Sequence, residues 1–246
     1  MQASKLVVIG ATSAIAKEVG RIYAGKAWAI DLVARSQEKM QILEEDFKAR
    51  GAVATRSLVF DFAVKNSYQE LVDWAGKDSQ VDVLLIAHGI LGDQQASEAS
   101  NEEALSVFRL NFLSHMSLLN LFAKQMEARA KGTMAIISSV AGDRGRQSNY
   151  FYGTAKGALS IYCQGLRNRL FKKNVHVITI KPGFVKTPMT AHLKQGPLFA
   201  EPEQVASDIV KAIEKKRDVL YTPWFWWGIM TIIKLIPEFI FKRLKL

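Results

Sequence analysis

A tyrosine and a lysine four positions apart, Tyr152 and Lys156, are the residues of this sequence best suited to proton chemistry. On a helix, this spacing places the phenol and the ammonium group on the same face, one turn apart. A free phenol titrates near a pH of about 10, and an adjacent ammonium favours the phenolate, which lowers that pKa. The pair is therefore suited to exchanging a proton with a bound molecule.

Two more polar residues precede this pair at positions that a parallel sheet can bring close to it. Ser139 closes the apolar run 135–139, thirteen residues before Tyr152, and Asn111 lies in the long amphipathic stretch before that run. We take Asn111, Ser139, Tyr152 and Lys156 as the candidate catalytic residues.

The hydrophobic pattern predicts the elements that must position these residues. Apolar runs of strand length alternate with amphipathic stretches of helical period. The predicted strands are 5–9, 29–34, 54–60, 82–87, 133–138, 175–180 and 218–222. The predicted helices are 14–26, 37–50, 66–78, 102–130, 151–173 and 202–216. Continuous Val, Ile and Leu runs indicate strands covered on both faces, so we expect one doubly wound α/β Rossmann domain over residues 1–222, with a parallel seven-stranded sheet.

The first predicted strand runs into a turn of small residues that opens a helix. In a dinucleotide-binding fold, the backbone N–H groups of this turn and the helix N-terminus bind the pyrophosphate. Of the usual fingerprint glycines only Gly10 is present, and alanines stand at positions 14 and 16. We predict cofactor contacts from Gly10, Thr12, Ser13, Ala14 and Ile15.

The end of the second strand bears on the choice of dinucleotide. An acidic residue there binds the ribose 2′-hydroxyl of NAD, whereas a cation suits the 2′-phosphate of NADP. Arg35 and Ser36 hold this position, so we predict NADPH as the preferred cofactor and NADH as a possible one. An exposed arginine that only ends the strand is the alternative. After the third strand, Asp61 and Phe62 follow, and Asp61 suits either the adenine amino group or a helix N-cap.

With these residues in this order, the chain resembles the short-chain dehydrogenase/reductase family over residues 1 to about 222. Segments 86–89 and 182–187 match two further family motifs, although His88 departs from the usual Asn-Asn-Ala-Gly pattern. Through these motifs the resemblance implies further cofactor contacts from Ala87, His88, Gly89, Pro182, Gly183, Val185 and Thr187. It also implies a homo-oligomer, because the helices near 102–130 and 151–173 commonly pair subunits in this family.

The resemblance also implies a reaction, the reduction of a carbonyl group by hydride from a nicotinamide. Tyr152 would donate the proton to the carbonyl oxygen, and Ser139 would hydrogen-bond that oxygen. Lys156 would hold the nicotinamide ribose hydroxyls and lower the pKa of the phenol. Asn111 would hold a water of the proton relay, and Thr187 would hold the carboxamide.

Residues 223–246 form a tail that contains three of the five tryptophans and ends in basic residues. Its polar positions recur every three or four residues, on one stripe of a helix: Thr231, Lys234, Glu238, Lys242 and Lys245. Pro237 and the charged residues break up the apolar stretch of about 20 residues that a membrane-spanning helix needs. Tryptophan and basic residues flanking an amphipathic helix favour a helix in the membrane interface. A buried or oligomer-covered helix and a spanning or re-entrant segment are the alternatives.

Segments 10–16 and 87–94, together with the tail, resemble a narrower group, the decaprenylphosphoryl-2-keto-ribose reductases of bacteria. This resemblance implies reduction of the 2-keto sugar of a polyprenyl phosphate to the arabinose epimer, after a flavin oxidase, in cell-wall arabinan biosynthesis. That reaction is often written with NAD(H). The phosphate would favour cations at the pocket rim, for which Arg144, Arg146, Lys186 and Lys194 are candidates; a solvated loop charge is the alternative for each.

Two other functions remain open on the sequence. One is a membrane-associated reductase of a steroid, a retinoid or a long-chain ketone. The other is a nucleotide-sensing or scaffold protein that keeps the fold without turnover, although such proteins typically lose the Tyr or the Lys.

Composition excludes several classes of protein. The single cysteine, Cys163, rules out a disulfide framework, and the four histidines are not at metal-ligand spacing, so we expect no metal. The net charge of +10 is the only feature that favours nucleic acid, and we expect none to bind. Residues 1–4 are too short for a secretory signal. We therefore expect a cytoplasmic protein bound peripherally to the inner face of the cell membrane.

Overall fold

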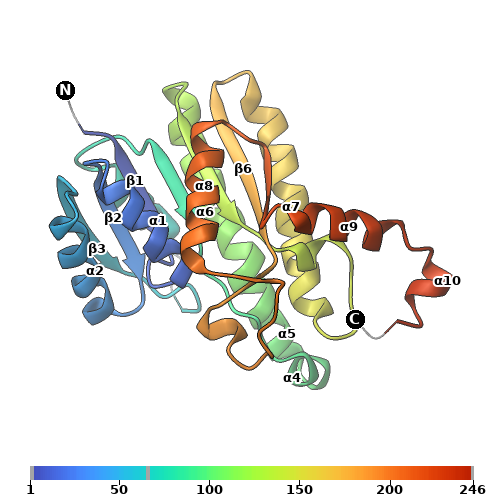
Figure 1. Ribbon diagram of the computed structural model, residues 1–246. Coiled ribbons are helices and arrows are strands. Elements are labelled where there is room, and N and C mark those ends of the chain that lie inside the picture. The colour runs from blue at the N-terminus through green and yellow to red at the C-terminus, as the bar shows by residue number, and fades with distance from the viewer. Residues whose placement is uncertain (1–2, 65–66, 245–246) are drawn as a thin grey trace.

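Seven parallel strands form one sheet in the computed structural model, which describes residues 3–64 and 67–244 (Figure 1). They are β1 (Lys5–Ile9), β2 (Ala29–Ala34), β3 (Ala54–Val59), β4 (Val83–Ile86), β5 (Gly132–Ile137), β6 (Val175–Pro182) and β9 (Val219–Thr222). Their order across the sheet is β3-β2-β1-β4-β5-β6-β9. The predicted seven-stranded parallel sheet is confirmed, and each predicted strand end lies within two residues of the observed one.

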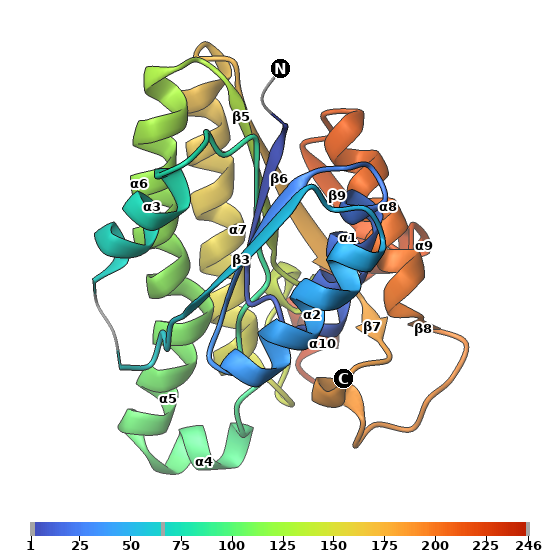
Figure 2. The ribbon, with the colours of Figure 1, turned by 90° about the vertical axis from the view of Figure 1, so that its left-hand side faces the viewer.

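Helices cover both faces of this sheet (Figure 2). On one face lie α1 (Ala14–Ala24), α2 (Gln37–Ala49) and α8 (Pro202–Glu214). On the other lie α3 (Tyr68–Gly76), α6 (Ser114–Ala128) and α7 (Tyr150–Phe171). The arrangement explains why the strands read as continuous apolar runs, because alternate side chains of each strand enter opposite cores.

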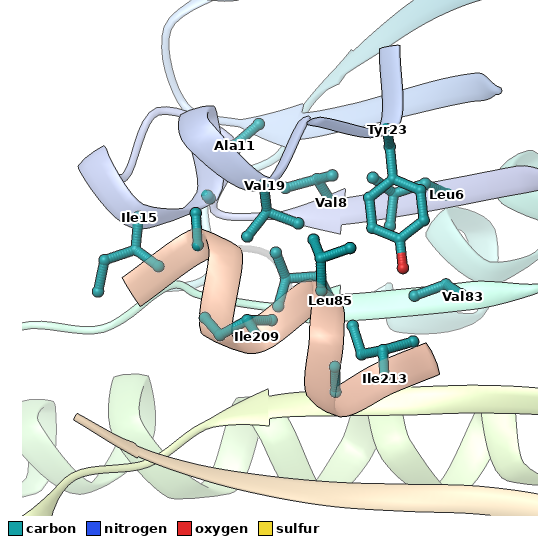
Figure 3. Packing of buried hydrophobic residues seen from close by; sticks show 14 of the residues in the cluster. Leu6, Val8, Ala11, Ile15, Val19, Tyr23, Val83, Leu85, Ile209 and Ile213 are labelled. Atoms are coloured by element: carbon teal, nitrogen blue, oxygen red, sulfur yellow. The ribbon is translucent and has the colours of Figure 1, made fainter. Parts of the chain in front are cut away.

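The first core shows how the two faces are filled. Leu6 and Val8 of β1 point toward α1 and α8, where Val19 and Ile209 meet them (Figure 3). Their neighbours along the same strand enter the core on the other side of the sheet. With both faces of β1 and β4 buried, the carboxyl ends of these strands are held in place, and the loops that follow them form the site described below.

Several short elements were not predicted. The single helix expected over 102–130 consists of α5 (Asn101–Phe108), a π-helical turn (Arg109–Leu113) and α6. A short α4 (Gln94–Ala99) precedes α5. The 3₁₀ turns η2 (Val140–Asp143) and η3 (Pro188–Thr190) and a small sheet of β7 (Phe184–Val185) and β8 (Phe199–Ala200) surround the carboxyl end of β6.

The tail is not the single helix expected over 223–246; residues 245–246 lie outside the described part of the chain. It forms α9 (Phe225–Leu235) and a short α10 (Glu238–Phe241), which extend to one side of the sheet (Figure 1). Pro237 causes the break, since it disfavours helical backbone at Ile236, which is extended with a ψ of 122°. Among the described residues, no helix combines the length and the apolar character needed to cross a membrane.

One side of α9 is buried and the other is exposed. Trp226 and Met230 pack against Val140 of η2, the turn that begins three residues after the end of β5. The opposite surface of α9 and α10 carries exposed apolar side chains, namely Trp224, Trp227, Ile232, Leu235, Phe239 and Ile240. The tail therefore belongs in part to the core and still presents a broad apolar surface.

Candidate active site

A cavity of about 820 Å³ lies at the carboxyl ends of the central strands. It is lined by loops that follow β1, β2, β3, β4, β5 and β6 and by the first turns of α7. Of the predicted site residues, all except Ser36 line this cavity. The Ser36 hydroxyl instead accepts a hydrogen bond from the backbone N–H of Lys39, at 3.3 Å, and caps α2.

The turn after β1 leaves no room for a side chain at Gly10. Its φ is +82°, and a Cβ there would lie 2.5 Å from the backbone nitrogen of His88. Glycine is therefore required, and the bare backbone forms this part of the cavity wall. Ser13 is the N-cap residue of α1, but its side chain makes no capping hydrogen bond within the described residues.

The predicted contacts at the adenine end differ in their surroundings. Arg35 is exposed, at the edge of the cavity directly after β2. Asp61 Oδ1 accepts the backbone N–H of Ala63 at 2.9 Å, so Asp61 closes a local turn, while Ser67 is the N-cap residue of α3. Asp31, which we did not assign to the ribose, is buried inside β2 and pairs with Lys5 at 3.2 Å.

Ser139 and Tyr152 meet inside the cavity. Ser139 lies two residues after the end of β5, and Tyr152 lies in the first turn of α7, where the two side chains interact. The Ser139 hydroxyl also accepts the backbone N–H of Ala141 at 3.1 Å, which fixes its position. Burial raises the pKa of Tyr152 to about 12, and the neighbouring Ser139 hydroxyl opposes that rise. The phenol is therefore protonated at neutral pH.

Lys156 lies one turn after Tyr152, as the spacing predicts. Its Nζ lies 5.9 Å from the centre of the Tyr152 ring and donates to the backbone carbonyl of Ile137 at 2.9 Å. Burial lowers the pKa of Lys156 to about 7. The sequence led us to expect a phenol pKa below its ordinary value, and this is wrong for the structure, because burial raises it. The burial that raises the pKa of Tyr152 also removes charge from Lys156.

The π-helical turn gives Asn111 its position. In a π-helix each N–H bonds the carbonyl five residues back, as the backbone N–H of Ser114 bonds the carbonyl of Arg109. The Asn111 amide donates to the carbonyls of Val107 and Ile90, each at 2.9 Å. A Cβ on Gly89 would lie 2.5 Å from Asn111 Oδ1 and 3.6 Å from Lys156 Nζ. Gly89 therefore allows these two side chains to approach the same point.

A second set of buried polar side chains, Ser114 and His115, lies next to His88 and was not predicted from the sequence. The His88 ring stacks on Phe62, with 4.1 Å between ring centres, and its Nε2 lies 2.8 Å from the hydroxyl of Ser114. His115 Nε2 lies 3.0 Å from the His88 carbonyl. His115 follows Asn111 by four positions, and this helical spacing was the signal that could have placed it beside the site.

Burial also determines the charge of this histidine pair. It lowers the pKa of His88 to about 3 and the pKa of His115 well below its ordinary value, and the charge of Lys156 adds to both effects. Both rings are neutral at physiological pH.

Of the four cations considered for the rim, only Arg146 lines the cavity. Arg144 turns away and binds the tail, and its Nη1 donates to the carbonyls of Ile233 at 2.7 Å and Ile236 at 2.6 Å. Lys186 forms an exposed ion pair with Glu201. Lys194 is exposed and lies outside the cavity wall.

Comparison with known proteins agrees with this geometry. The family model of the short chain dehydrogenases matches residues 4–197. An uncharacterized oxidoreductase of Mycobacterium tuberculosis is 30% identical over 243 residues, which cover 98% of this chain and 97% of the relative. A short-chain dehydrogenase from Sphingobium yanoikuyae in complex with NADPH has the same fold, with a TM-score of 0.83 at 17% identity, covering 96% and 97% of the two chains.

An actinorhodin polyketide ketoreductase variant with NADPH also shares the fold, with a TM-score of 0.81 at 20% identity, covering 91% of this chain and 97% of the other. These likenesses concern the fold alone. The family match and the full-length relative go further: the chain belongs to the short-chain dehydrogenase family of NAD(P)-dependent oxidoreductases, which act on carbonyl and hydroxyl groups.

Proposed function

We propose that this protein is an NADPH-dependent reductase of a ketone, with Tyr152 as the proton donor. The observation that carries the proposal is that Tyr152 and Ser139 lie on the wall of one cavity and interact there, with Ser139 lowering the pKa of the phenol. A carbonyl oxygen placed at these two hydroxyls receives a proton from one and a hydrogen bond from the other.

The residues of the cavity fit a dinucleotide. At Gly10 the backbone itself forms the wall, beside the N-terminus of α1, which suits a pyrophosphate. Arg35 at the cavity edge suits a 2′-phosphate, and the two similar structures with NADPH support that choice over NADH. When bound, the cofactor would supply the hydride.

The chain's own residues handle the proton. Because its pKa is raised to about 12, the Tyr152 phenol holds its proton at neutral pH until a carbonyl oxygen gains charge. Ser139 orients that oxygen. Lys156, with a pKa of about 7, binds the nicotinamide ribose and in its charged form stabilises the phenolate left behind. Asn111 orders a water that returns the proton, and Thr187 binds the carboxamide.

As substrate we propose the 2-keto sugar of a polyprenyl phosphate, reduced to its arabinose epimer. Apolar side chains on the cavity wall, Ile90, Leu91, Leu110, Phe151, Phe184 and Leu193, suit a prenyl chain. An oxidase, such as a flavin enzyme, must supply the ketone. A neutral steroid, retinoid or long-chain ketone would use the same apolar wall. Arg146 in that wall favours the phosphate-bearing substrate.

We propose that the tail 223–246, whose inner side packs on the reductase domain 1–222, binds the membrane surface with its outer side. Support comes from exposed Trp224, Trp227 and Phe239 together with the basic side chains of Lys234 and Lys242, a combination typical of the membrane interface. This binding would hold the cytoplasmic enzyme at the inner face of the cell membrane.

Sedimentation with phosphatidylglycerol vesicles tests the membrane proposal. We expect the wild type to sediment and the triple variant Trp224→Ser, Trp227→Ser, Phe239→Ser to bind at least about 10-fold more weakly. The matched control replaces two exposed apolar residues far from the tail, Ile42→Ser and Val64→Ser, and should bind like the wild type. Equal binding of both variants would refute the role of the tail.

We also propose a homo-oligomer that pairs through the face of α5, the π-helical turn and α7. Four large apolar side chains are exposed there, namely Leu105, Leu113, Ile161 and Phe171. A stable interface buries such residues. Light scattering of the wild type and of Ile161→Asp tests this, and we expect the variant to dissociate.

The decisive experiment for the function is NADPH consumption with an extracted polyprenyl-phosphate keto sugar. Tyr152→Phe should lower kcat by at least about 10³-fold, because the proton donor is lost, while the Kd for NADPH changes by less than about 3-fold. Undiminished turnover by the variant would end the assignment. NADPH binding by the wild type without any turnover of carbonyl substrates would favour a nucleotide-sensing protein.

A further inference from the structure

Two arginines of one loop, Arg144 and Arg146, have very different surroundings. Arg144 is fully engaged: it donates to three backbone carbonyls at the end of α9, pairs with Glu238 at 2.9 Å and stacks on the Phe241 ring at 3.8 Å. Arg146, two residues later, lines the cavity. The loop therefore commits one guanidinium to structure and leaves the other facing the site.

The hydrogen-bonding groups of Arg146 are poorly satisfied. Its Nε is buried and has no acceptor among residues 3–64 and 67–244. Its Nη2 donates to the sulfur of Met230, at 3.2 Å, and a thioether is a weak acceptor. Leaving a buried N–H donor without an acceptor costs more than a typical hydrogen bond gains. Such a cost is expected where a ligand supplies the missing acceptor.

The nearest carboxylate does not fill this role. Asp143 lies three residues before Arg146, but its Oδ1 binds Lys181 and its Oδ2 accepts the hydroxyl of Tyr221 at 2.6 Å. Asp143 thereby ties η2 to β6 and β9. The guanidinium of Arg146 remains available to an anion in the cavity.

The position of Arg146 in the chain indicates that an anion bound there belongs to the substrate and not to the cofactor. Arg146 lies seven residues after Ser139 and six before Tyr152, on the segment that joins the two hydroxyls. The groups suited to the cofactor phosphates, at Gly10 and Arg35, follow β1 and β2 instead. β5 and β2 are separated in the sheet by β1 and β4.

We propose that Arg146 binds a phosphate group of the substrate and so selects phosphate-bearing ketones. A guanidinium offers a planar pair of donors that matches two phosphate oxygens. This inference rests on the proposed function, because it assumes a ketone at Tyr152. The shared chemistry is a phosphate close to a carbonyl, carried either by a lipid or by a small soluble molecule.

Three ketones with one core distinguish these possibilities: dihydroxyacetone, dihydroxyacetone phosphate and its long-chain ester palmitoyl-dihydroxyacetone phosphate. In the wild type we expect kcat/KM to be highest for a phosphate-bearing ketone. Arg146→Met should lower the ratio of phosphate-bearing to neutral ketone by about 100-fold or more, and Arg146→Lys should restore part of it. A higher kcat/KM for the palmitoyl ester than for dihydroxyacetone phosphate indicates that the phosphate is carried by a lipid. A lower one indicates that it is carried by a small soluble molecule.

Lys194→Met, which removes an exposed cation next to two lining residues, is the matched control and should keep the wild-type ratio. An unchanged ratio in Arg146→Met overturns the inference, while turnover of the ketones leaves the proposed function standing. If the wild type reduces none of the three ketones, the inference is tested instead by the effect of inorganic phosphate on Tm. A rise in Tm with phosphate that is lost in Arg146→Met and kept in Arg35→Met supports the inference, and the opposite pattern overturns it.

Discussion

The indole of Trp226 lies so close to Gly183 that a Cβ on the glycine would be 1.9 Å from the indole nitrogen. Gly183 follows β6 and lines the cavity, whereas Trp226 belongs to α9 of the tail. The tail therefore supports the wall of the site through its inner side. Any change that displaces α9 will reach the cavity.

Gly183→Ala should for this reason damage both stability and turnover. The added methyl group forces a large buried ring to move, and overpacking of this kind costs about 1–3 kcal/mol. We expect a matching loss in the free energy of unfolding, measured by urea denaturation, together with a lower kcat/KM.

Two variants test the physical reason. Trp226→Leu in the Gly183→Ala background frees space and should recover part of the loss, giving a favourable interaction energy in a double-mutant cycle. Gly228→Ala places a methyl group on the same helix where no atom lies within 4 Å, so it should be neutral or stabilise by up to about 1 kcal/mol. A destabilisation by Gly228→Ala equal to that at Gly183 would contradict the packing argument.

Arg35→Asp should turn the preference from NADPH toward NADH. The carboxylate repels a 2′-phosphate and can accept from a 2′-hydroxyl, so we expect the ratio of kcat/KM values to change by about 100-fold, or about 2.7 kcal/mol. Lys39→Asp makes the same charge change on the exposed side of α2 and should leave the ratio near that of the wild type. A ratio that is the same in both variants would remove Arg35 from cofactor selection.

The buried histidine pair should make the protein sensitive to acid. Burial lowers the pKa of His88 to about 3, and His115 is shifted in the same direction, whereas both titrate near about 6.5 when unfolded. Between these values the unfolded chain binds more protons, so stability is lost as the pH falls through this range. We expect a loss of up to about 1.4 kcal/mol per pH unit for each histidine.

Urea denaturation of the wild type and of His115→Phe, from about pH 7 to about pH 5, measures this effect. The phenyl ring keeps the contact with His88 and cannot be protonated, so the variant should lose less stability on acidification. If the difference in the free energy of unfolding between the two proteins does not change with pH, His115 is not held neutral by the fold.

Arg144→Met should release the end of the tail. The guanidinium satisfies carbonyls that a helix C-terminus leaves unpaired, and hydrogen bonds to a charged group are worth about 1.5–3 kcal/mol. We expect faster amide hydrogen exchange in residues 236–244 and a loss of about 2 kcal/mol in stability. Arg144→Lys should not restore protection, because one ammonium cannot reach all the carbonyls and the Phe241 ring. Full protection in the lysine variant would mean that charge alone holds the tail.

Most of the sheet was predictable because each buried strand can be identified from its own short run of apolar residues. Strands buried on both faces must be apolar throughout, so β1 and β4 stand out as runs with polar turns after them. Ser139 and Tyr152 could be paired as candidates because each lies at the carboxyl end of such a run or in the helix that follows it. Both residues line the same cavity, at the edge of the sheet where the order of the elements already placed them.

The features that were missed depend on contacts between distant segments. The spacing of polar residues in the tail predicts an amphipathic helix, but it does not predict that Trp226 and Met230 pack against Val140. The raised pKa of Tyr152 and the lowered pKa of Lys156 were not predicted for a similar reason. Spacing places the two groups together, whereas the burial that decides both pKa values comes from the packed fold.

The π-helical turn at Asn111 has a consequence for insertions and deletions. A π-helical turn accommodates one residue more than a regular α-helix of the same length. Deleting one residue such as Leu113 would let α5 and α6 continue as one regular helix with little change to their packing. The Leu110 carbonyl would regain its backbone partner, and the Asn111 side chain would no longer be aimed at Gly89. A chain shortened by this single residue would keep its fold and lose this amide from the site.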